Sequence, residues 1–332
     1  MLRIAVIGCG GIALSQHGPA YRKYALEHPD TELVACCDLI SKRAEDFRQR
    51  FGFRQAYTNW QRMLLETQPE AVCLNVPPAS TAELTQQILR LGYPLLLEKP
   101  PGMNRDEIEA MMRCARETGT PNQVAFNRRY MPLMARLKAR LDERFTPNQI
   151  QYIHYNFCRV GRTDPDFSTT AIHGIDAVRF LAGADYASVQ FSYQPLWGYE
   201  QQVVNIYLRC TLQSGAVAQI SFCPVSGWVI ERAEVYVAGH TFFLNTPIWK
   251  GYDFPGELVH VENGVVMDRI SGSELSNSSE DFVLNGFYAE DETFFDAIRQ
   301  GKRPAGDIQS GKQSVEIAQA IRERRETIDL ST

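Results

Sequence analysis

A short apolar run followed at once by a glycine-rich stretch opens the chain, and it constrains the fold more than any other feature. Leu2–Ile7 has the length of a buried strand, and Gly8-Cys9-Gly10-Gly11-Ile12-Ala13 follows with the pattern G-x-G-x-x-A. The next stretch, 12–26, has the pattern of a helix. A strand, this glycine pattern and a helix in that order predict a phosphate-binding turn, because the turn brings free backbone N–H groups to a helix N-terminus.

Each residue of this turn has an expected part. Gly8 permits the tight turn, Gly10 lets a pyrophosphate approach the backbone, and Ala13 keeps the helix close to the strand. We therefore expect Gly8, Gly10, Gly11, Ile12 and Ala13 to contact a bound dinucleotide. The alternative is a glycine-rich turn without a ligand.

Asp38 ends the second predicted strand, 32–37, where its carboxylate is placed to accept hydrogen bonds from ribose hydroxyls. The same charge repels a 2′-phosphate, so the sequence favours NAD(H), with NADP(H) as the alternative. Ser41, Lys42 and Arg43 follow and offer a phosphate site, but a helix start with solvated charges is the preferred interpretation.

Strands and helices alternate through the first 125 residues, which predicts parallel βαβ units and a doubly wound Rossmann domain over 1–125. The strands are expected at 2–7, 32–37, 71–76, 93–97 and 123–126. The helices between them are expected at 12–26, 41–51, 60–66, 81–91 and 106–117.

The pattern changes after this point, and residues 126–332 are predicted to form an α+β domain with an open, mostly antiparallel sheet. Helices are expected at 132–144, 168–181, 287–299 and 309–325, with the last two either in this domain or packed back on the first. Strands are expected at 149–158, 188–193, 203–212, 216–222, 233–238 and 241–244, with a polar loop at 161–166 and a Ser-rich loop at 271–281. If helices cover one face of the sheet, a partner subunit is the natural cover for the other, so a homodimer or homotetramer is expected.

Composition excludes several classes of protein. The chain has 332 residues with 44% hydrophobic and 22% charged side chains, which is typical of a globular protein and not of a disordered one. A net charge of −5 gives no basic excess for nucleic acid. With neither a membrane span nor a signal-peptide core in the sequence, a soluble, cytoplasmic protein is expected. The eight cysteines form no C-x-x-C pair and the histidines no H-E-x-x-H pattern, so core thiols and no metal are expected.

Glu98-Lys99-Pro100 follows a predicted parallel strand at its carboxyl end, where ligands of such sheets bind. The lysine is held beside prolines, and its ammonium can donate to a substrate hydroxyl or carbonyl. A surface Lys–Glu pair is the alternative.

These motifs together resemble the glucose–fructose oxidoreductase/inositol dehydrogenase/MocA family of oxidoreductases, and the resemblance covers nearly the whole chain. Val76-Pro77-Pro78 is similar to the family's turn on the nicotinamide side, and Asn127-Arg128-Arg129-Tyr130 to its passage between domains. Residues 287–304 are similar to the family's C-terminal helix signature. The resemblance implies hydride transfer between NAD(P) and a sugar, polyol or sugar derivative.

The resemblance also implies roles for single residues. Lys99 and His173 would be catalytic, because Ile172-His173-Gly174-Ile175-Asp176 matches the family's I-H-x-x-D segment. Lys99, His173, Asp176, Arg128 and Tyr130 are then expected at the substrate, with solvated charge as the alternative for Arg128 and Arg129. The cofactor is expected to contact Val76, Pro77, Glu98, Lys99 and Asn127 as well as the glycine turn and Asp38.

One position departs from the family pattern. Many members that oxidise polyols carry an aspartate four residues before the histidine, and Thr169 stands there in this chain. Asp164 and Asp166 lie just upstream as substitutes. Two other functions therefore stay open: a sensor that binds cofactor and sugar with little turnover, and a redox-neutral, NAD-dependent enzyme that cleaves glycosides.

Overall fold

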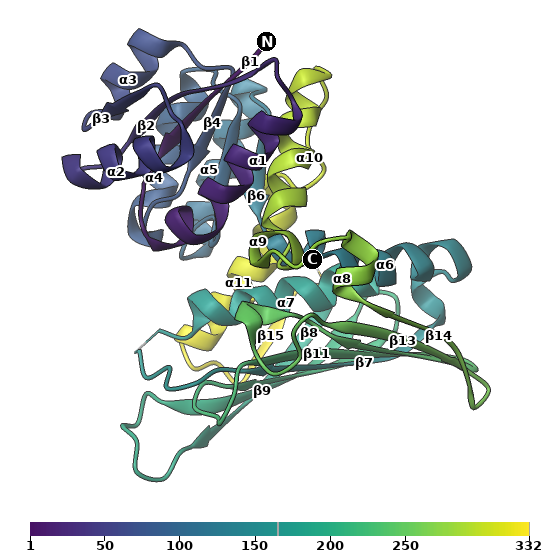
Figure 1. Cartoon of the computed structure of the whole chain (residues 1–332). Helices are drawn as coiled ribbons and strands as arrows, with labels where there is room; N and C mark the ends of the chain where they lie inside the picture. The colour runs from purple at the N-terminus through teal and green to yellow at the C-terminus, as the bar shows by residue number, and fades with distance from the viewer. Residues whose placement is uncertain (165, 332) are drawn as a thin grey trace. The chain divides into compact units, whose positions relative to one another are not determined.

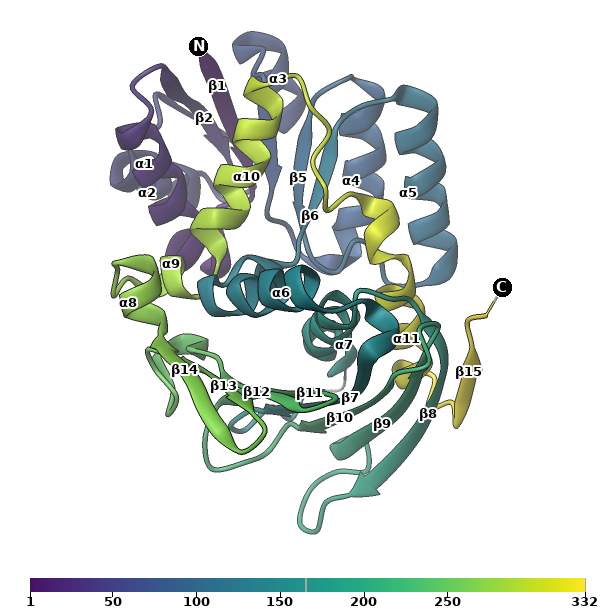
Figure 2. The same ribbon diagram turned by 90° about the vertical axis from the view of Figure 1, so that its right-hand side faces the viewer.

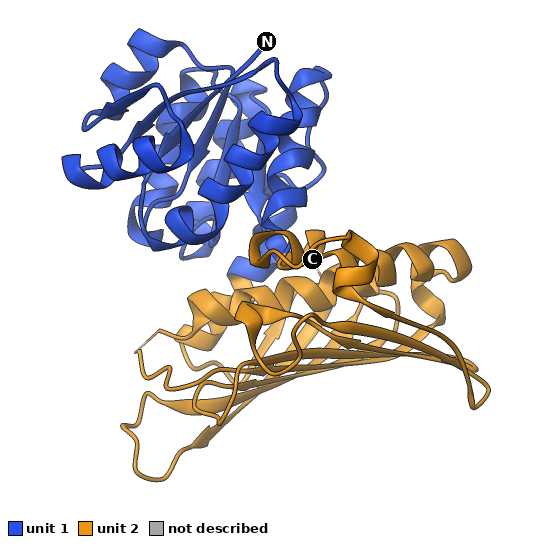
Figure 3. Ribbon diagram, in the orientation of Figure 1, with its two compact units in different colours: residues 1–127, 286–315 blue, residues 128–285, 316–332 orange. Residues whose placement is uncertain are grey.

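The structure, a computed structural model, describes residues 1–164 and 166–331 (Figure 1). Pro165 of the predicted polar loop and Thr332 at the chain end lie outside the described residues. The chain divides into two compact units (Figure 3). Unit 1 comprises residues 1–127 and 286–315, and unit 2 comprises residues 128–285 and 316–332. Residues 286–315 therefore group with the N-terminal unit, and the second unit is built from two separate stretches of chain.

Unit 1 contains a six-stranded parallel sheet in the order β3-β2-β1-β4-β5-β6. This order reverses direction between β1 and β4, as in dinucleotide-binding doubly wound folds, so the predicted Rossmann class is confirmed. The strands are β1 (Leu2–Ile7), β2 (Thr31–Cys37), β3 (Gln55–Tyr57), β4 (Ala71–Leu74), β5 (Leu95–Glu98) and β6 (Asn122–Ala125).

The helices of unit 1 begin and end at residues with clear local causes. Gly52, with φ of 83°, closes α2, and Asn104 accepts a hydrogen bond from Glu107 N at the start of α5. The helical segments are η1 (Ala13–His17, a π-helical turn), α1 (Gly18–Glu27), α2 (Ser41–Phe51), α3 (Trp60–Thr67), α4 (Pro78–Arg90), α5 (Arg105–Thr118), α10 (Phe287–Arg299) and η5 (Ile308–Gly311). Helix α10 packs against α1, where Tyr24 Oη donates to Asp296 Oδ1 at 2.8 Å.

Unit 2 contains a nine-stranded sheet in the order β14-β13-β12-β11-β7-β10-β9-β8-β15. Among the described strands of this second sheet, only β7 and β10 pair in parallel. The predicted open, mostly antiparallel sheet is therefore confirmed. The strands are β7 (Ile150–Cys158), β8 (Tyr186–Pro195), β9 (Val204–Leu212), β10 (Val217–Cys223), β11 (Ile230–Val237), β12 (His240–Asn245), β13 (Glu257–Glu262), β14 (Val265–Ser271) and β15 (Thr327–Asp329).

Helices α6 and α7 lie over one face of this sheet (Figure 2). Gly174 lets α7 approach closely, since a Cβ there would lie 2.9 Å from the Phe222 ring. The sheet residues facing the helices are buried and alternate with half-exposed ones, as on β11. The helical segments are η2 (Asn127–Tyr130), α6 (Pro132–Arg144), η3 (Pro147–Gln149), α7 (Ser168–Ala182), η4 (Ile248–Lys250), α8 (Gly272–Ser276), α9 (Asp281–Leu284) and α11 (Lys312–Arg322).

The structure corrects the sequence analysis at a few elements. Residues 271–281 are not one loop, because Ser271 caps the short helix α8 through a capping box with Glu274. The observed helix α11 is shorter than the predicted helix 309–325, because a 3-10 turn takes the place of its first residues. Among the described helices, none combines the length and the apolar character that a membrane crossing requires.

Candidate functional site

The glycine turn of unit 1 has the geometry that a dinucleotide requires. Gly8 has φ of 95°, and a Cβ there would lie 2.2 Å from Asn75 O, so only glycine fits between β1 and β4. A Cβ on Gly10 or Gly11, in contrast, would meet nothing within 4 Å. The backbone is therefore open to a ligand at the carboxyl edge of the sheet, where Leu14 N donating to Gly10 O starts the first helix.

Asp38 lies beside this turn at the end of β2. Its carboxylate accepts hydrogen bonds from Cys9 N at 3.0 Å and from Ile40 N at 2.9 Å, which fixes its orientation against the glycine turn. Each carboxylate oxygen keeps a further lone pair for a hydroxyl donor. Leu39 and Ile40 follow with exposed side chains and provide apolar surface next to the carboxylate. An anionic acceptor beside open backbone N–H groups fits the ribose and pyrophosphate of NAD.

Glu98 and Lys99 follow β5, at the same edge of the sheet. Glu98 is buried, and its Oε2 accepts a hydrogen bond from Lys99 N at 3.0 Å. Its Oε1 lies 3.0 Å from His17 Nε2, and His17 Nδ1 lies 3.1 Å from Asp291 Oδ1 on α10. The backbone of Lys99 is thus connected through Glu98 and His17 to Asp291, all within unit 1.

The charges of this buried triad are strongly coupled. Burial acts to lower the pKa of His17, but Asp291 and Glu98 outweigh it and raise that pKa well above its ordinary value. Burial raises the pKa of Asp291 to about 6, although His17 acts to lower it. Burial also acts to raise the pKa of Glu98, but the hydrogen bond and charge of His17 hold it below its ordinary value. The imidazolium of His17 between Glu98 and Asp291 therefore offsets the cost of burying carboxylate charge, which would be large without a partner.

The other residues expected at the cofactor also belong to unit 1. Val76 and Pro77 follow β4, which pairs with β1, and Pro77 precedes the first turn of α4. Asn127 follows β6 and is buried. The structure thus brings the glycine turn, Asp38, Val76-Pro77, Glu98-Lys99 and Asn127 to the carboxyl ends of β1, β2, β4, β5 and β6.

His173 lies in unit 2, near the middle of α7, and is 7% exposed. Its neighbour Gly174 lets α7 lie close to the sheet, because a Cβ there would lie 2.9 Å from the Phe222 ring. Three residues further on, Asp176 is 1% exposed and accepts a two-pronged ion pair from Arg129, with Arg129 Nε 2.7 Å from Asp176 Oδ2. This pair joins η2 to α7 and holds the helix that carries His173.

Arg128 points into the interior of unit 2. Its side chain is 2% exposed and donates to Glu231 on β11 at 2.7 Å. Arg159 and Tyr155 also donate to Glu231, which is fully buried. Neither Arg128 nor Arg129 is the solvated charge that the sequence left as an alternative, while Tyr130 is half-buried.

Thr169 lies four residues before His173 on α7, so both side chains share one face of the helix. Its Oγ1 donates to Asp166 O at 3.3 Å. Asp166 accepts from Ser168 N and lies 3.6 Å from Arg322, and Asp164 is paired with Arg162 at 2.6 Å. Both upstream aspartates therefore already have partners within unit 2.

Sequence reasoning missed His17 and Asp291 as supports of the Glu98-Lys99 segment, and Glu231 as the partner of Arg128. His17 and Asp291 are 274 positions apart, and no linear motif connects them. The available signal was weak: a histidine one helical turn beyond Ala13, facing the same sheet edge as the glycine motif.

Comparison with known proteins adds a decisive observation. Residues 2–126 match the sequence profile of an oxidoreductase family with an NAD-binding Rossmann fold, the GFO_IDH_MocA family. This match agrees with the family resemblance that the glycine and Glu-Lys-Pro motifs carry, and its NAD-binding description agrees with the expected NAD-type cofactor.

Proteins similar to this chain include two that are named as dehydrogenases. The scyllo-inositol 2-dehydrogenase (NAD(+)) of Bacillus subtilis strain 168 is 24% identical over 91% of this chain and 88% of its own length. The D-glucoside 3-dehydrogenase of Escherichia coli strain K12 is 31% identical over 39% of this chain and 36% of its own length.

Solved structures share the fold of the whole chain. A levoglucosan dehydrogenase in complex with NADH matches with a TM-score of 0.82 and 17% identity, over 99% of both chains. A dehydrogenase from Chromobacterium violaceum matches with a TM-score of 0.82 and 18% identity, over 98% of this chain and 95% of the other.

Proposed function

We propose that the protein is an NAD-dependent dehydrogenase that oxidises a secondary hydroxyl of a sugar, polyol or sugar derivative. The observation that carries the proposal is Lys99 at the carboxyl end of β5, on a backbone anchored through Glu98 to His17, at the same sheet edge as the open glycine turn. Relatives named as scyllo-inositol and D-glucoside dehydrogenases support the substrate class.

Bound NAD would supply the hydride acceptor. Gly10, Gly11 and Asp38 would bind its pyrophosphate and ribose, and Val76, Pro77 and Asn127 would adjoin the rest of the cofactor. Asp38 favours NAD over NADP, because a 2′-phosphate would meet its carboxylate.

The protein's own chemistry is a proton transfer that accompanies loss of hydride from the substrate carbon. The Lys99 ammonium would donate a hydrogen bond to the reacting oxygen and stabilise negative charge on it. His173 would accept the hydroxyl proton at a ring nitrogen, since imidazole is the side chain that most often acts as a general base. Tyr130 is the further candidate for substrate contact. Arg128 and Asp176 stay predicted substrate residues, and their ion pairs with Glu231 and Arg129 would hold them in position.

Substrate turnover tests the proposal directly. Purified protein would be mixed with NAD⁺ or NADP⁺ and a panel of polyols, monosaccharides, glycosides and sugar acids, and nicotinamide reduction would be followed by absorbance. We expect reduction with at least one class and a preference for NAD⁺. Tight NAD⁺ binding without reduction on any compound would contradict the dehydrogenase and favour a sensor. Release of a sugar leaving group without net reduction would favour the redox-neutral reaction.

We also propose that the protein forms a homodimer or homotetramer through the sheet of unit 2. The sheet face opposite α6 and α7, here called the outer face, carries Tyr152, Tyr207, Tyr236 and Phe243 together with Arg209, Gln219 and Glu234. Aromatic side chains and arginine are enriched at interfaces between subunits, and this mixture is typical of them.

A further inference from the structure

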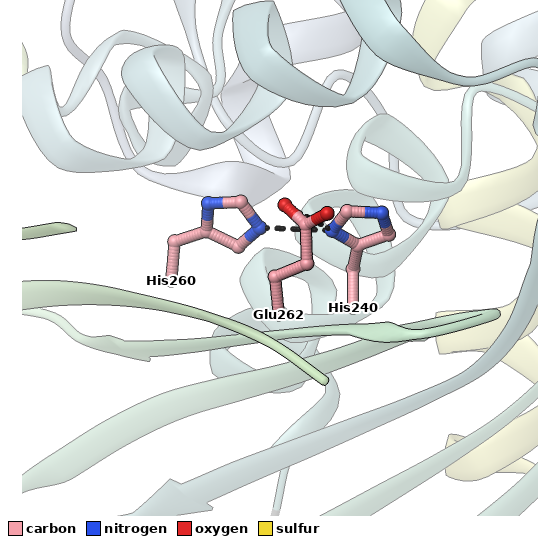
Figure 4. Close-up of side chains that lie close together, drawn as sticks. All are labelled: His240, His260 and Glu262. Atoms are coloured by element: carbon pink, nitrogen blue, oxygen red, sulfur yellow. Dashed lines mark hydrogen bonds and ion pairs between the residues drawn. The ribbon is translucent and has the colours of Figure 1, made fainter. Parts of the chain in front are cut away.

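Two histidines and a glutamate, His240, His260 and Glu262, meet at one end of β12 and β13 (Figure 4). His240 Nδ1 lies 3.1 Å from His260 Nε2 and 3.6 Å from Glu262 Oε2. One ligand atom from each of the three residues lies within 4.8 Å of the other two. No sequence motif predicts a metal here, because His240, His260 and Glu262 do not have the spacing of a helical ligand motif.

Strand pairing brings these side chains together. In the antiparallel pair β12–β13, His240 is opposite Glu262, and Phe242 is opposite His260. Residues two apart on a strand point to the same face, so all three polar side chains share the helix-covered face with Phe242. A His-x-Glu pair on one strand and a histidine on its neighbour therefore converge without any spacing signal between positions 240 and 260.

Aromatic packing holds both imidazoles in place. The Phe242 ring stacks on His260 with 4.3 Å between centroids and 8° between planes. Phe145, which follows α6, lies 5.0 Å from the His240 ring. His260 is 4% exposed, while the side chains of His240 and Glu262 are 13% and 30% exposed. The cluster is thus rigid on one side and accessible to an ion on the other.

The distances suit a metal ion. Zinc bonds to histidine nitrogen at about 2.0–2.1 Å, so two ligand atoms of a tetrahedral site lie about 3.4 Å apart. The observed separations of 3.1 and 3.6 Å bracket this value.

We propose that His240, His260 and Glu262 form a binding site for a divalent transition-metal ion of the zinc class, with water completing the coordination. Such an ion would replace the proton that the two facing nitrogens share and would cross-link β12 to β13. Borderline-soft ions that accept imidazole are favoured over Mg²⁺ or Ca²⁺, which prefer oxygen ligands.

Nearby cations set an expectation for affinity. Arg144 Nη2 lies 3.4 Å from Glu262 Oε2, and Arg140 pairs with Asp268 on the adjacent strand β14. Both guanidinium groups oppose a divalent ion. Removing Arg144 should therefore tighten metal binding, whereas removing a ligand should weaken it.

Calorimetry tests the site. The tag-free full chain is first stripped of metal with a chelator and then titrated with Zn²⁺. A parallel titration with Co²⁺ adds a visible absorption spectrum that reports the ligands. We expect one ion per chain at this site. His260→Ala should weaken Zn²⁺ binding by more than about a hundredfold, since loss of an outer-shell partner already costs about 10–100-fold. Arg144→Gln should strengthen it by about two- to fivefold. His154→Ala, a histidine on the outer face of the same sheet, is the matched control and should change nothing.

Glu262→Gln distinguishes loss of metal binding from loss of the fold, because the substitution is conservative and the side chain is partly exposed. It should keep the thermal unfolding temperature of the metal-free protein while weakening Zn²⁺ binding and changing the Co²⁺ spectrum. The proposal would be overturned by no Zn²⁺ binding to the unmodified chain. It would equally be overturned by binding that His260→Ala and Glu262→Gln leave unchanged.

Discussion

At the scale of single residues, the hydrogen bonds of Asp38 to the local backbone bear on which cofactor binds. It accepts two backbone hydrogen bonds, so its carboxylate is already oriented before a ribose arrives. Pre-orientation lowers the entropy that a ligand must lose on binding. Asp38 therefore acts on affinity for NAD and on discrimination against NADP through the same atoms.

Asp38→Ser should weaken NAD⁺ binding by about 10–100-fold, because hydrogen bonds to a charged group contribute about 1.5–3 kcal/mol. The ratio of NADP⁺ to NAD⁺ affinity should rise, since the repelling charge is gone. Fluorescence titration with NADH and NADPH measures both effects. Asp46→Asn, an exposed carboxylate on α2, serves as the control, and equal losses in both variants would contradict the role of Asp38.

At the scale of elements, buried charge networks join segments that are far apart in the chain. In unit 1, His17 connects η1 to the end of β5 and to α10. In unit 2, Glu231 connects β11 to η2, to Tyr155 on β7 and to Arg159 directly after β7. Breaking such a pair leaves an uncompensated buried charge, which is costly.

His17→Gln should destabilise unit 1 by about 3–5 kcal/mol at neutral pH, because Glu98 and Asp291 lose the cation between them. The folded-state pKa of His17 is raised, so its contribution is complete below pH 6.5 and is lost as the pH rises through the folded value. The difference from the unmodified protein should therefore shrink in alkaline solution. Urea unfolding at several pH values measures this stability difference, with His28→Gln as the control. A difference between His17→Gln and the unmodified protein that does not change with pH would contradict the prediction.

Glu231→Gln should destabilise unit 2 by about 3–5 kcal/mol, because Arg128 and Arg159 would stay buried without a counter-charge. Burial acts to raise the pKa of Glu231, but the two arginines lower it to about 2. The stability that its carboxylate contributes is therefore present above 4.5 and lost as the pH falls toward 2. The variant should lack this acid-dependent loss in urea unfolding curves. Glu143→Gln, at an exposed position on α6, should behave like the unmodified protein.

The same scale shows how far a sequence predicts structure. Helices α2 and α6 were predicted with the bounds observed, because Gly52 closes the first and Pro132 opens the second. The strands β3 and β15 have three residues each and depend on pairing with β2 and β8, so no local pattern marks them. In the site, Gly8 and Asp38 are predictable from the sequence, because the residues next to them complete a recognisable local pattern. The partners of Glu98 and of His240 are set by tertiary packing and strand register, which a linear motif does not record.

At the scale of the whole molecule, the outer face of the unit 2 sheet is the feature that bears on assembly. Tyr152 and Tyr236 lie on neighbouring strands with ring centroids 5.8 Å apart, and Tyr207 donates to Gln194 at 2.8 Å. These hydrogen-bonded aromatic side chains form an ordered surface that can be buried with few polar groups left unsatisfied.

Size-exclusion chromatography with light scattering should report a dimer or tetramer for the unmodified chain. The double variant Tyr152→Lys/Tyr207→Lys should shift the mass toward the monomer, because two cations would have to be buried on each side of the interface. Leu65→Lys, at an exposed position on α3 of unit 1, should leave the assembly unchanged. A monomeric unmodified chain would contradict the proposed assembly.

The central claim, that this chain is a dehydrogenase in which Lys99 assists proton transfer, is tested most directly by replacing that lysine. The rate of NAD⁺ reduction would be measured for the unmodified protein and for Lys99→Ala with the best compound from the panel. NADH affinity would be measured separately, and Lys23→Ala, a partly exposed lysine on α1, serves as the control. We predict that Lys99→Ala lowers kcat/KM by about 10²–10⁴-fold, the usual contribution of a positioned acid or base, while Lys23→Ala does not. Turnover by Lys99→Ala at the unmodified rate would contradict the claim.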